Sequence, residues 1–363
     1  MINQARLLDT FLALVGIDSP SGEEAAIAQQ LKGHLIQLGM SVELDAMHNL
    51  VAHLPGKGES LLLAAHMDTV TPGRGVKPVL RDGVVYSDGT TILGADDKSG
   101  IAVILEVLHV FQEQGLPHPP LEVLITVQEE VGLLGAKGLD KSRLHSTMGI
   151  SFDAGDGPGA IVVSAPSHDT LSAVVHGRAS HAGTQPEKGV SAIVVAAQAI
   201  LDMPLGRIDE ETTANIGTIR GGAATNIIPD RVELRGEARS RQMTKLEAQT
   251  SKMVEALQSA ARRYGASVDV EVQREYESYN LTESDPMVSR LMAACQAVGV
   301  EPVLVPTGGG SDANILNAAG MHVVNLSTGM AAEHSTAEHI AVAEMVTCAE
   351  IVLQCIVRLA ARP

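Results

Sequence analysis

The amino-acid sequence predicts an α/β protein with a second, α+β domain inserted into it. Apolar runs typical of strands alternate with helical patterns up to about residue 166 and again after residue 275, as around a mainly parallel sheet. Between these segments, strand and helix patterns follow one another in the ferredoxin-like order βαββαβ. We therefore predict a main domain at residues 1–166 and 276–363, and an inserted domain at residues 167–275.

Composition excludes several classes of protein. The chain has 363 residues, of which 45% are hydrophobic and 19% charged, as is typical of a folded globular protein. Its formal net charge of −17 argues against non-specific binding to nucleic acid or to anionic membranes, because both require a basic surface. The three cysteines show no CxxC pairing, and the amphipathic N-terminal segment is too short and interrupted to span a bilayer. We expect a reduced, cytoplasmic protein without a targeting segment.

The N-terminal part predicts two helices followed by three strands. Ser21 and Glu24 are spaced as a capping box for the second helix, which is expected to end near Gly39. The strands are predicted at residues 42–44, 50–54 and 61–65. The third strand is followed by His66 and Asp68, which point to the same side of an extended chain. This is the usual arrangement of a metal-bound imidazole and its orienting acid, although a structural histidine explains the pair equally well.

Three further segments place acidic residues beside predicted elements. Asp96 and Asp97 precede a helix at residues 101–114. Asp96 could bind a metal there, or either aspartate could simply cap the helix. The buried-strand pattern at residues 121–127 is followed by Glu129 and Glu130. Adjacent carboxylates can divide two tasks, cation binding and proton transfer, although a solvated turn would also carry them. A strand at residues 148–152 then leads into Asp153.

These positions converge on one edge of the predicted sheet. Ligands of open α/β sheets bind beyond the carboxyl ends of the strands. His66, Glu130 and Asp153 are all at such ends, and Asp96 begins a helix. Carboxylate and imidazole ligands suit Zn²⁺, Co²⁺ or Mn²⁺ better than metals that prefer thiolates. The sequence therefore predicts a metal site.

The remaining elements are predicted from the same patterns. In the inserted domain, strands are expected at residues 168–175, 212–220, 231–238 and 267–273, with helices at 189–202 and 244–264. The main domain then resumes with a helix at 286–298, a strand at 302–305, the loop TGGGSDAN, a strand at 322–326 and a last helix at 342–359.

Eight motifs in order carry a family resemblance along nearly the whole chain: HMDTV, LGADDKSG, QEEVGLLGAKGL, FDAG, SHAG, GGAATNIIPD, GGGSDAN and GMAAEHS. Together they resemble the peptidase T family of dinuclear zinc metallopeptidases. This group also contains aminoacylase, carboxypeptidase G, acetylornithine deacetylase and succinyl-diaminopimelate desuccinylase. The resemblance implies a zinc-peptidase-like catalytic domain with an inserted lid and dimerisation domain.

The resemblance also implies a role for each matched residue. One metal would be bound by His66 and Asp153, the other by Glu130 and His334, and Asp96 would bridge the two. Glu129 resembles the general base, and Asp68 the acid that supports His66. A strained peptide is expected between Asp96 and Asp97. Since the family's ligand histidine precedes Ser or Thr, with an acid one turn later, His334 followed by Glu338 is preferred to His339.

The inserted domain and one loop supply further candidates by resemblance. His181 resembles a histidine that stabilises the oxyanion, often from the partner subunit. Asn226 and Arg239 resemble residues that hold the substrate carboxylate, a task that suits the planar guanidinium. A surface arginine is an equally good interpretation of Arg239. The loop at residues 308–312 would line the pocket.

The predicted function is the hydrolysis of an amide bond in short peptides by a peptidase T-like aminopeptidase, a tripeptidase, through a water bridged between two divalent metal ions. Zinc is expected, with cobalt or manganese as alternatives. The expected partners are a peptide or acyl-amino-acid substrate and a second copy of the chain, bound through the inserted domain. An N-acyl-amino-acid amidohydrolase or a carboxypeptidase of the same family is the alternative. A non-catalytic peptide-binding protein is a more distant alternative. Such a protein would be expected to lack the general base or a metal ligand, whereas Glu129 and all five candidate ligands are present.

Overall fold

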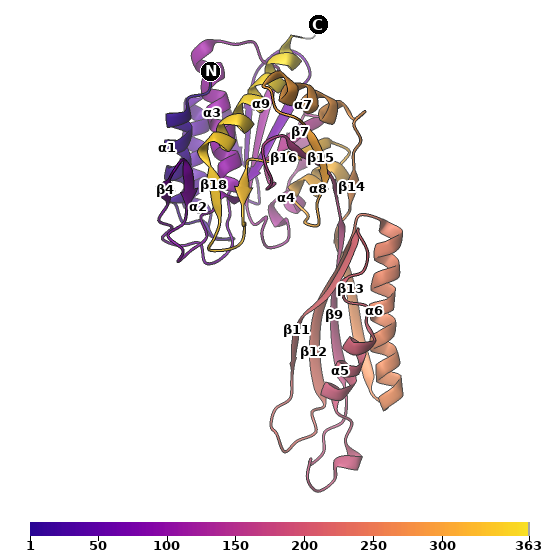
Figure 1. Ribbon diagram of the computed structural model, residues 1–363. Helices are drawn as coiled ribbons and strands as arrows, with labels where there is room; N and C mark the ends of the chain where they lie inside the picture. The colour runs from indigo at the N-terminus through magenta and orange to yellow at the C-terminus, as the bar shows by residue number, and fades with distance from the viewer. Residues whose placement is uncertain (362–363) are drawn as a thin grey trace. The chain divides into compact units, whose positions relative to one another are not determined.

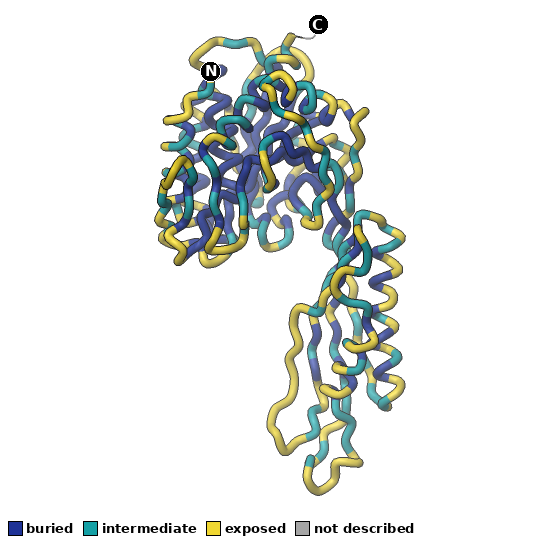
Figure 2. Tube along the Cα trace, viewed as in Figure 1, coloured by how far each residue is buried: buried dark blue, intermediate teal, exposed yellow. Residues whose placement is uncertain are grey.

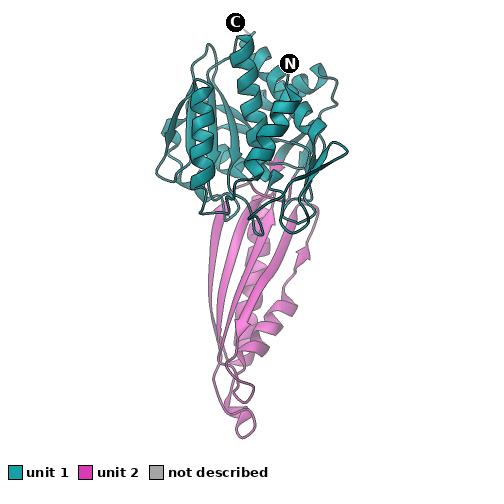
Figure 3. Ribbon diagram, turned by 90° about the vertical axis from the view of Figure 1, so that its left-hand side faces the viewer, with its two compact units in different colours: residues 1–163, 281–306, 311–363 teal, residues 164–280, 307–310 magenta. Residues whose placement is uncertain are grey.

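A computed structural model describes residues 1–361, which divide into two compact units (Figure 3). Unit 1 contains residues 1–163, 281–306 and the chain from Ser311 onward. Unit 2 contains residues 164–280 and 307–310. None of the helices in the described part of the chain is long and apolar enough to cross a membrane.

Unit 1 is built on a mixed sheet with the strand order β1-β2-β6-β3-β7-β16-β8, and β15 also pairs with β8. These strands are β1 (Ser41–Leu44), β2 (Leu50–Leu54), β3 (Leu61–His66), β6 (Leu121–Thr126), β7 (Met148–Ser151), β8 (Ala160–Ala165), β15 (Val303–Pro306) and β16 (His322–Leu326). The central strands β6, β3, β7 and β16 run parallel to one another. Their carboxyl ends therefore meet at one edge. They are buried along nearly their whole length (Figure 2), as their near-continuous apolar sequences predict.

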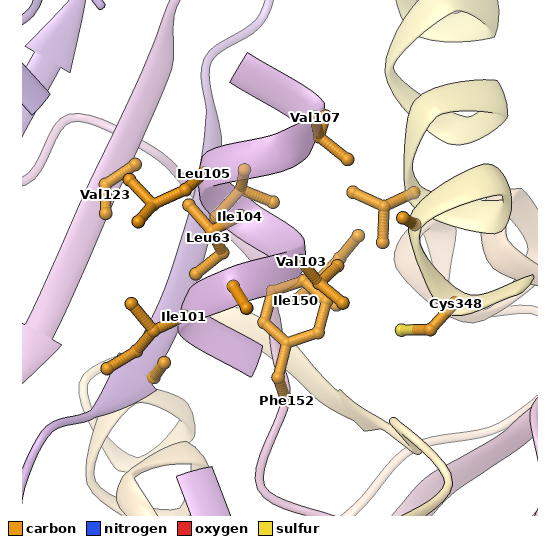
Figure 4. Packing of buried hydrophobic residues seen from close by; sticks show 14 of the residues in the cluster. Leu63, Ile101, Val103, Ile104, Leu105, Val107, Val123, Ile150, Phe152 and Cys348 are labelled. Carbon is orange, nitrogen blue, oxygen red and sulfur yellow. The ribbon is translucent and has the colours of Figure 1, made fainter. Parts of the chain in front are cut away.

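The helices of unit 1 enclose this sheet (Figure 1). They are α1 (Gln4–Val15), α2 (Ala25–Gln37), α3 (Ala95–Gln114), α4 (Leu134–Gly138), α7 (Pro286–Ala297), α8 (Asp312–Ala318) and α9 (Val342–Ala360), with a 3-10 turn η1 at Lys141–Arg143. Helix α3 is apolar on nearly all sides and is accordingly buried. In Figure 4, Leu105 of α3 lies beside Val123 of the sheet, whereas Val103 lies on the side of Cys348 of α9. The core thus fixes the N-terminus of α3 against the sheet edge.

A small four-stranded sheet completes unit 1. Its order is β17-β18-β5-β4, and its strands are β4 (Val79–Arg81), β5 (Val84–Tyr86), β17 (Met330–Ala331) and β18 (His339–Ala341). Strands β4 and β5 form a hairpin whose turn contains Gly83 at a φ of 80°, a conformation that glycine adopts readily. The segment between β17 and β18 carries His334.

Unit 2 is an antiparallel sheet with two helices. Its strand order is β10-β11-β12-β9-β13, and its elements are β9 (Ser167–His176), η2 (Pro186–Lys188), α5 (Ala192–Asp202), β10 (Gly206–Arg207), β11 (Thr212–Gly221), β12 (Arg231–Ser240), α6 (Met243–Tyr264) and β13 (Ser267–Tyr276). The short β14 (Tyr279–Asn280) pairs with the end of β8. Buried residues alternate with mostly half-buried ones along β9, so one face of the sheet is covered, and α5 and α6 pack there around a separate core. The long strands and helices follow the predicted ferredoxin-like order.

Several local features differ from the predictions. The residues of β8 and α8 were not assigned to a strand and a helix. The proposed capping box is absent: Glu24 is the N-cap residue of α2 but makes no side-chain cap. The Ser21 hydroxyl instead donates to Asp68 Oδ2 at 2.6 Å, because a fully buried carboxylate competes successfully for a local donor.

Candidate metal centre

The predicted ligands lie together at the carboxyl edge of the parallel strands in unit 1. His66 ends β3, Glu130 follows β6 and Asp153 follows β7, while Asp96 lies at the start of α3. They form two groups, one of His66, Asp96 and Asp153 and the other of Asp96, Glu130 and His334. Within each group the potential ligand atoms lie within 4.8 Å of one another. Only Asp96 belongs to both groups, so the two candidate cation sites share one carboxylate.

The two oxygens of Asp96 face different histidines. Asp96 Oδ1 is 2.9 Å from His66 Nε2, and Asp96 Oδ2 is 3.2 Å from His334 Nε2. His334 Nε2 is also 3.1 Å from Glu130 Oε2. A carboxylate that directs one oxygen to each side has the geometry required to bridge two cations.

The acidic surroundings of the two histidines favour their charged forms. Hydrogen bonds to Asp96 and Glu130 raise the pKa of His334 to about 10. Burial alone would lower the pKa of His66, but hydrogen bonds to Asp68 and Asp96 raise it well above its ordinary value. Protonated imidazoles would therefore offset part of the negative charge of the cluster when no metal is bound. Metal binding would release these protons.

Two other carboxylates of the cluster, those of Asp153 and Glu129, have a raised pKa, whereas the pKa of Asp96 is lowered. Burial, followed by repulsion from Asp96, raises the pKa of Asp153, and burial with repulsion from Asp153 raises that of Glu129. Glu130 Oε1 is buried without a hydrogen-bond partner among the described residues. An excess of buried carboxylates with an unpaired oxygen, next to two imidazoles, is the donor set that divalent cations stabilise. The residues present therefore fit two divalent metals.

Asp68 organises the turn that carries Glu129 and Glu130. Its Oδ1 accepts the backbone N–H of Glu129 at 2.9 Å, and its Oδ2 accepts that of Glu130 at 3.2 Å. The carboxylate is 3.6 Å from His66 Nδ1, whereas the backbone oxygen of Asp68 lies closer to this nitrogen, at 3.0 Å. The carbonyl oxygen can only accept, so it fixes a proton on Nδ1 and directs Nε2 toward Asp96.

Two buried acids, Glu338 and Asp312, support the site through hydrogen bonds that were not predicted from the sequence. Glu338 accepts the backbone N–H groups of Leu93 and Gly94 at 2.7 and 2.8 Å, and that of Asp96 at 3.0 Å. Asp312 accepts a hydrogen bond from Thr126, and burial raises its pKa to about 6. The sequence contained a weak signal for each, because Glu338 belongs to the His334 motif and Asp312 to GGGSDAN. The loop at residues 308–312 was expected to line the pocket, and the structure shows that the Asp312 side chain is bonded at the end of β6.

The structure also distinguishes between neighbouring candidates. His339 lies in β18 and stacks on Tyr86, with ring centroids 5.3 Å apart, so it does not begin the final helix. Asp96 and Asp97 have non-helical backbone angles at a kink near the start of α3. The Asp96 oxygens contact the two histidines, and the Asp97 oxygens have no hydrogen-bond partner among the described residues, so neither side chain caps the helix. The peptide bond between these two aspartates is cis.

A cavity of about 710 Å³ opens in unit 1 beside the segments that carry Asp153 and His334. Its lining includes three carboxylate side chains, those of Asp156, Glu333 and Glu344, and the stacked rings of Tyr86 and His339. Burial and the charge of Asp96 raise the pKa of Glu333. The cavity is therefore acidic, with aromatic rings on its wall.

The candidates in unit 2 lie in two places. His181 and Asn226 are in neighbouring loops, joined by a hydrogen bond from the Ala182 N–H to the Asn226 backbone oxygen. Both side chains are exposed. Arg239, on β12, is partly buried and forms an ion pair with Glu237 at 3.1 Å. The structure thus brings His181 and Asn226 together and places Arg239 separately in the sheet.

The chain is similar to known proteins over almost its whole length. A model of peptidase family M20/M25/M40 matches residues 62–358. The YqjE protein of Bacillus subtilis strain 168 is 43% identical over 363 residues, covering 97% of this chain and 98% of that protein. The solved aminopeptidase PepT of Bacillus cereus ATCC 10987 is 44% identical, with a TM-score of 0.91 and 99% of each chain covered. A solved tripeptidase of Staphylococcus aureus subsp. aureus Mu50 is 41% identical, with a TM-score of 0.96 and 100% of each chain covered. These likenesses confirm the predicted α/β fold class.

Proposed function

Because this chain belongs to peptidase family M20/M25/M40, and is therefore a peptide-bond hydrolase, we propose that it is an aminopeptidase that removes the N-terminal residue from short peptides, tripeptides above all. The proposal agrees with the activities named for the two solved relatives, at 44% and 41% identity. The observation that carries the chemistry is Asp96, placed between two groups of ligands with Glu129 beside them.

The proposed metal ligands are the residues of the two groups. Asp96 would be shared, His66 and Asp153 would complete one site, and Glu130 and His334 the other. We propose zinc for both sites because imidazole and carboxylate ligands suit it. When bound, two such cations lower the pKa of a water molecule and polarise the substrate carbonyl.

Glu129 is the proposed general base. It is nearly fully buried and its backbone is fixed by Asp68. Its pKa is raised by burial and neighbouring carboxylates, so it would hold a proton well once it had accepted one from the attacking water. It could then transfer that proton to the departing amine.

Residues of unit 2 are proposed to stabilise the oxyanion and the substrate carboxylate. His181 Nδ1 accepts the N–H groups of Gly183 and Thr184 at 3.1 and 3.2 Å, so the proton of the neutral ring is on Nε2. That N–H group can donate to a developing negative charge. Arg239 and Asn226 are proposed to bind the carboxylate. In support, Arg239 Nε has no hydrogen-bond partner among the described residues.

The acidic cavity supports recognition of a free amino group and so favours the aminopeptidase over the acylase alternative. We predict that Glu333→Gln raises KM for a free tripeptide about tenfold or more, because a hydrogen bond to a charged group is lost. The inhibition constant of an N-blocked tripeptide should be unchanged. Glu283→Gln, an exposed acid elsewhere in unit 1, is the control. Equal weakening of both peptides would show that Glu333 does not contact the amine.

Product analysis tests the proposed function directly. Zinc-loaded protein is incubated with a free tripeptide, an N-blocked tripeptide and an N-acetyl amino acid. Release of the N-terminal residue from the free tripeptide alone is the expected result. Cleavage of a blocked or acetylated substrate would instead identify a carboxypeptidase or an amidohydrolase. Binding of the tripeptide without cleavage would favour the peptide-binding alternative.

We further propose a cytoplasmic homodimer formed through unit 2. Large apolar side chains are exposed on α5, where Leu201 is 79% and Ile193 is 43% accessible. The three cysteines are buried and free, as expected for a reducing compartment. Exposed apolar patches often mark protein interfaces. If His181 acts on the partner's site, dimerisation would also be required for activity.

The double variant Ile193→Glu/Leu201→Glu is predicted to be monomeric. Charges on this surface would have to be buried in the dimer without a partner. Light scattering after gel filtration should show two copies of the 37.9-kDa chain for the wild type and one for the variant. Ile36→Glu, an exposed apolar residue of unit 1, should remain dimeric. A variant that still forms the dimer would exclude this face of α5 from the interface.

A further inference from the structure

A second cluster of potential metal ligands lies at the opposite end of β6 from the candidate catalytic site. Glu122 is near the amino end of this strand, whereas Glu129 and Glu130 follow its carboxyl end. At about 3.3 Å per residue, Glu122 is about 13 Å from Thr126 at the other end of the strand. The two clusters are therefore separate.

Three elements of unit 1 contribute to this cluster. His53 on β2 is the direct cross-strand partner of Glu122 on β6. His145 lies in the segment between η1 and β7. His53 Nδ1 is 3.2 Å and His145 Nδ1 is 2.9 Å from the same carboxylate oxygen, Glu122 Oε1. The two rings are in edge contact, with centroids 5.6 Å apart.

More nitrogen atoms contact the Glu122 carboxylate than its oxygens can accept hydrogen bonds from. The strand LEVLIT is otherwise apolar, apart from its terminal threonine, and Glu122 is 2% exposed. Oε2 accepts the backbone N–H of Ser146 at 2.9 Å, and that of His145 at 3.1 Å, so the carboxylate is already held in place. Oε1 has three nitrogens within 3.2 Å, the backbone nitrogen and Nδ1 of His145 and Nδ1 of His53. A carboxylate oxygen has only two lone pairs for these three contacts.

The candidate catalytic site provides an internal comparison. There, imidazole nitrogens approach carboxylate oxygens at 2.9 to 3.2 Å. The contacts of His53 and His145 with Glu122 fall in the same range, 2.9 to 3.2 Å. All three groups also have their potential ligand atoms within 4.8 Å. The cluster thus has imidazole-to-carboxylate distances in the same range as the ligand groups at the catalytic edge.

We propose that His53, Glu122 and His145 form an additional site for a divalent transition metal, with zinc as the preferred ion. Two imidazoles and a carboxylate are a typical zinc donor set. The backbone amides that hold the carboxylate supply the supporting contacts that fix a ligand's orientation. His145 is 74% exposed, so a fourth position is open to water. A metal bound there links β2, β6 and the segment before β7, and stabilises the edge of the sheet remote from the catalytic cluster.

Zinc content measured by mass spectrometry tests the proposal. Wild-type protein and the variant His53→Ala/His145→Ala are equilibrated with micromolar zinc and desalted. The variant is expected to contain one zinc per chain fewer, with unchanged turnover of peptide substrate, since neither residue belongs to the catalytic cluster. His176→Ala is the matched control, because His176 also contacts a carboxylate, that of Asp269 at 2.9 Å, but without a second histidine.

The difference in zinc content does not depend on the proposed peptidase activity, so the two hypotheses can fail separately. A second measurement is the unfolding midpoint with and without added zinc, on a wild type whose catalytic sites are already filled. Further zinc should raise the midpoint of the wild type and of His176→Ala, but not that of the double variant. Equal zinc content in the wild type and a folded double variant would overturn the proposal and leave a hydrogen-bonded cluster.

Discussion

Glu129→Gln is expected to lower kcat about 10²- to 10⁴-fold while both catalytic metals stay bound, because positioned general bases contribute accelerations of this size. Glutamine preserves the size of the side chain but cannot accept and hold the proton. Asp68 contacts the backbone of residue 129, so its hydrogen bond and the turn should be retained. KM should change little, since the loss is confined to the transition state.

Two measurements make this prediction decisive. Metal content must match the wild type, which separates loss of the base from loss of a cation. Glu106→Gln is the matched control, because it also removes a buried carboxylate but from the middle of α3, where Glu106 pairs with Arg6. Its kcat should be unchanged at temperatures where the variant is folded. Wild-type turnover by a Glu129→Gln protein with full metal content would exclude Glu129 as the base.

Asp96→Ala is expected to abolish activity and to reduce the binding of both catalytic metals. Asp96 is common to the two ligand groups, so its removal takes one ligand from each. Asp153 belongs to one group only, so Asp153→Ala should weaken the binding of a single metal. Zinc content relative to the wild type should therefore fall by two ions in the first variant and by one in the second.

Thermal unfolding gives an independent measure of the same effect. A ligand present at 100 times its Kd stabilises the folded state by about 2.7 kcal/mol per site. Zinc at the catalytic cluster should therefore raise the unfolding midpoint of chelator-treated wild-type protein. In Asp96→Ala, the increase in midpoint that is due to zinc at this cluster should be absent. If Asp96→Ala retains both catalytic metals, the shared-carboxylate arrangement is wrong.

The fold class and the motifs of the family could both be predicted from the amino-acid sequence. Apolar runs such as residues 121–127 predict buried strands because the pattern is local and hydrophobic burial acts on each residue of it. Polar residues at the ends of these runs, such as His66 and Asp153, indicated a site because parallel strands end at a common edge. The family resemblance was then confirmed by a match over residues 62–358.

Which side chains contact one another in the site depends on the folded arrangement of the chain. The oxygens of Asp96 face His66 and His334, and the latter is 238 positions away in the chain. Glu338 holds the backbone at Asp96 from 242 positions away. The local sequence predicts that Ser21 caps a helix, but in the structure its hydroxyl donates to Asp68. Local rules act over a few residues, whereas a buried charge is stabilised by whatever donors the folded chain brings to it, so these partners could not be assigned before the fold was known.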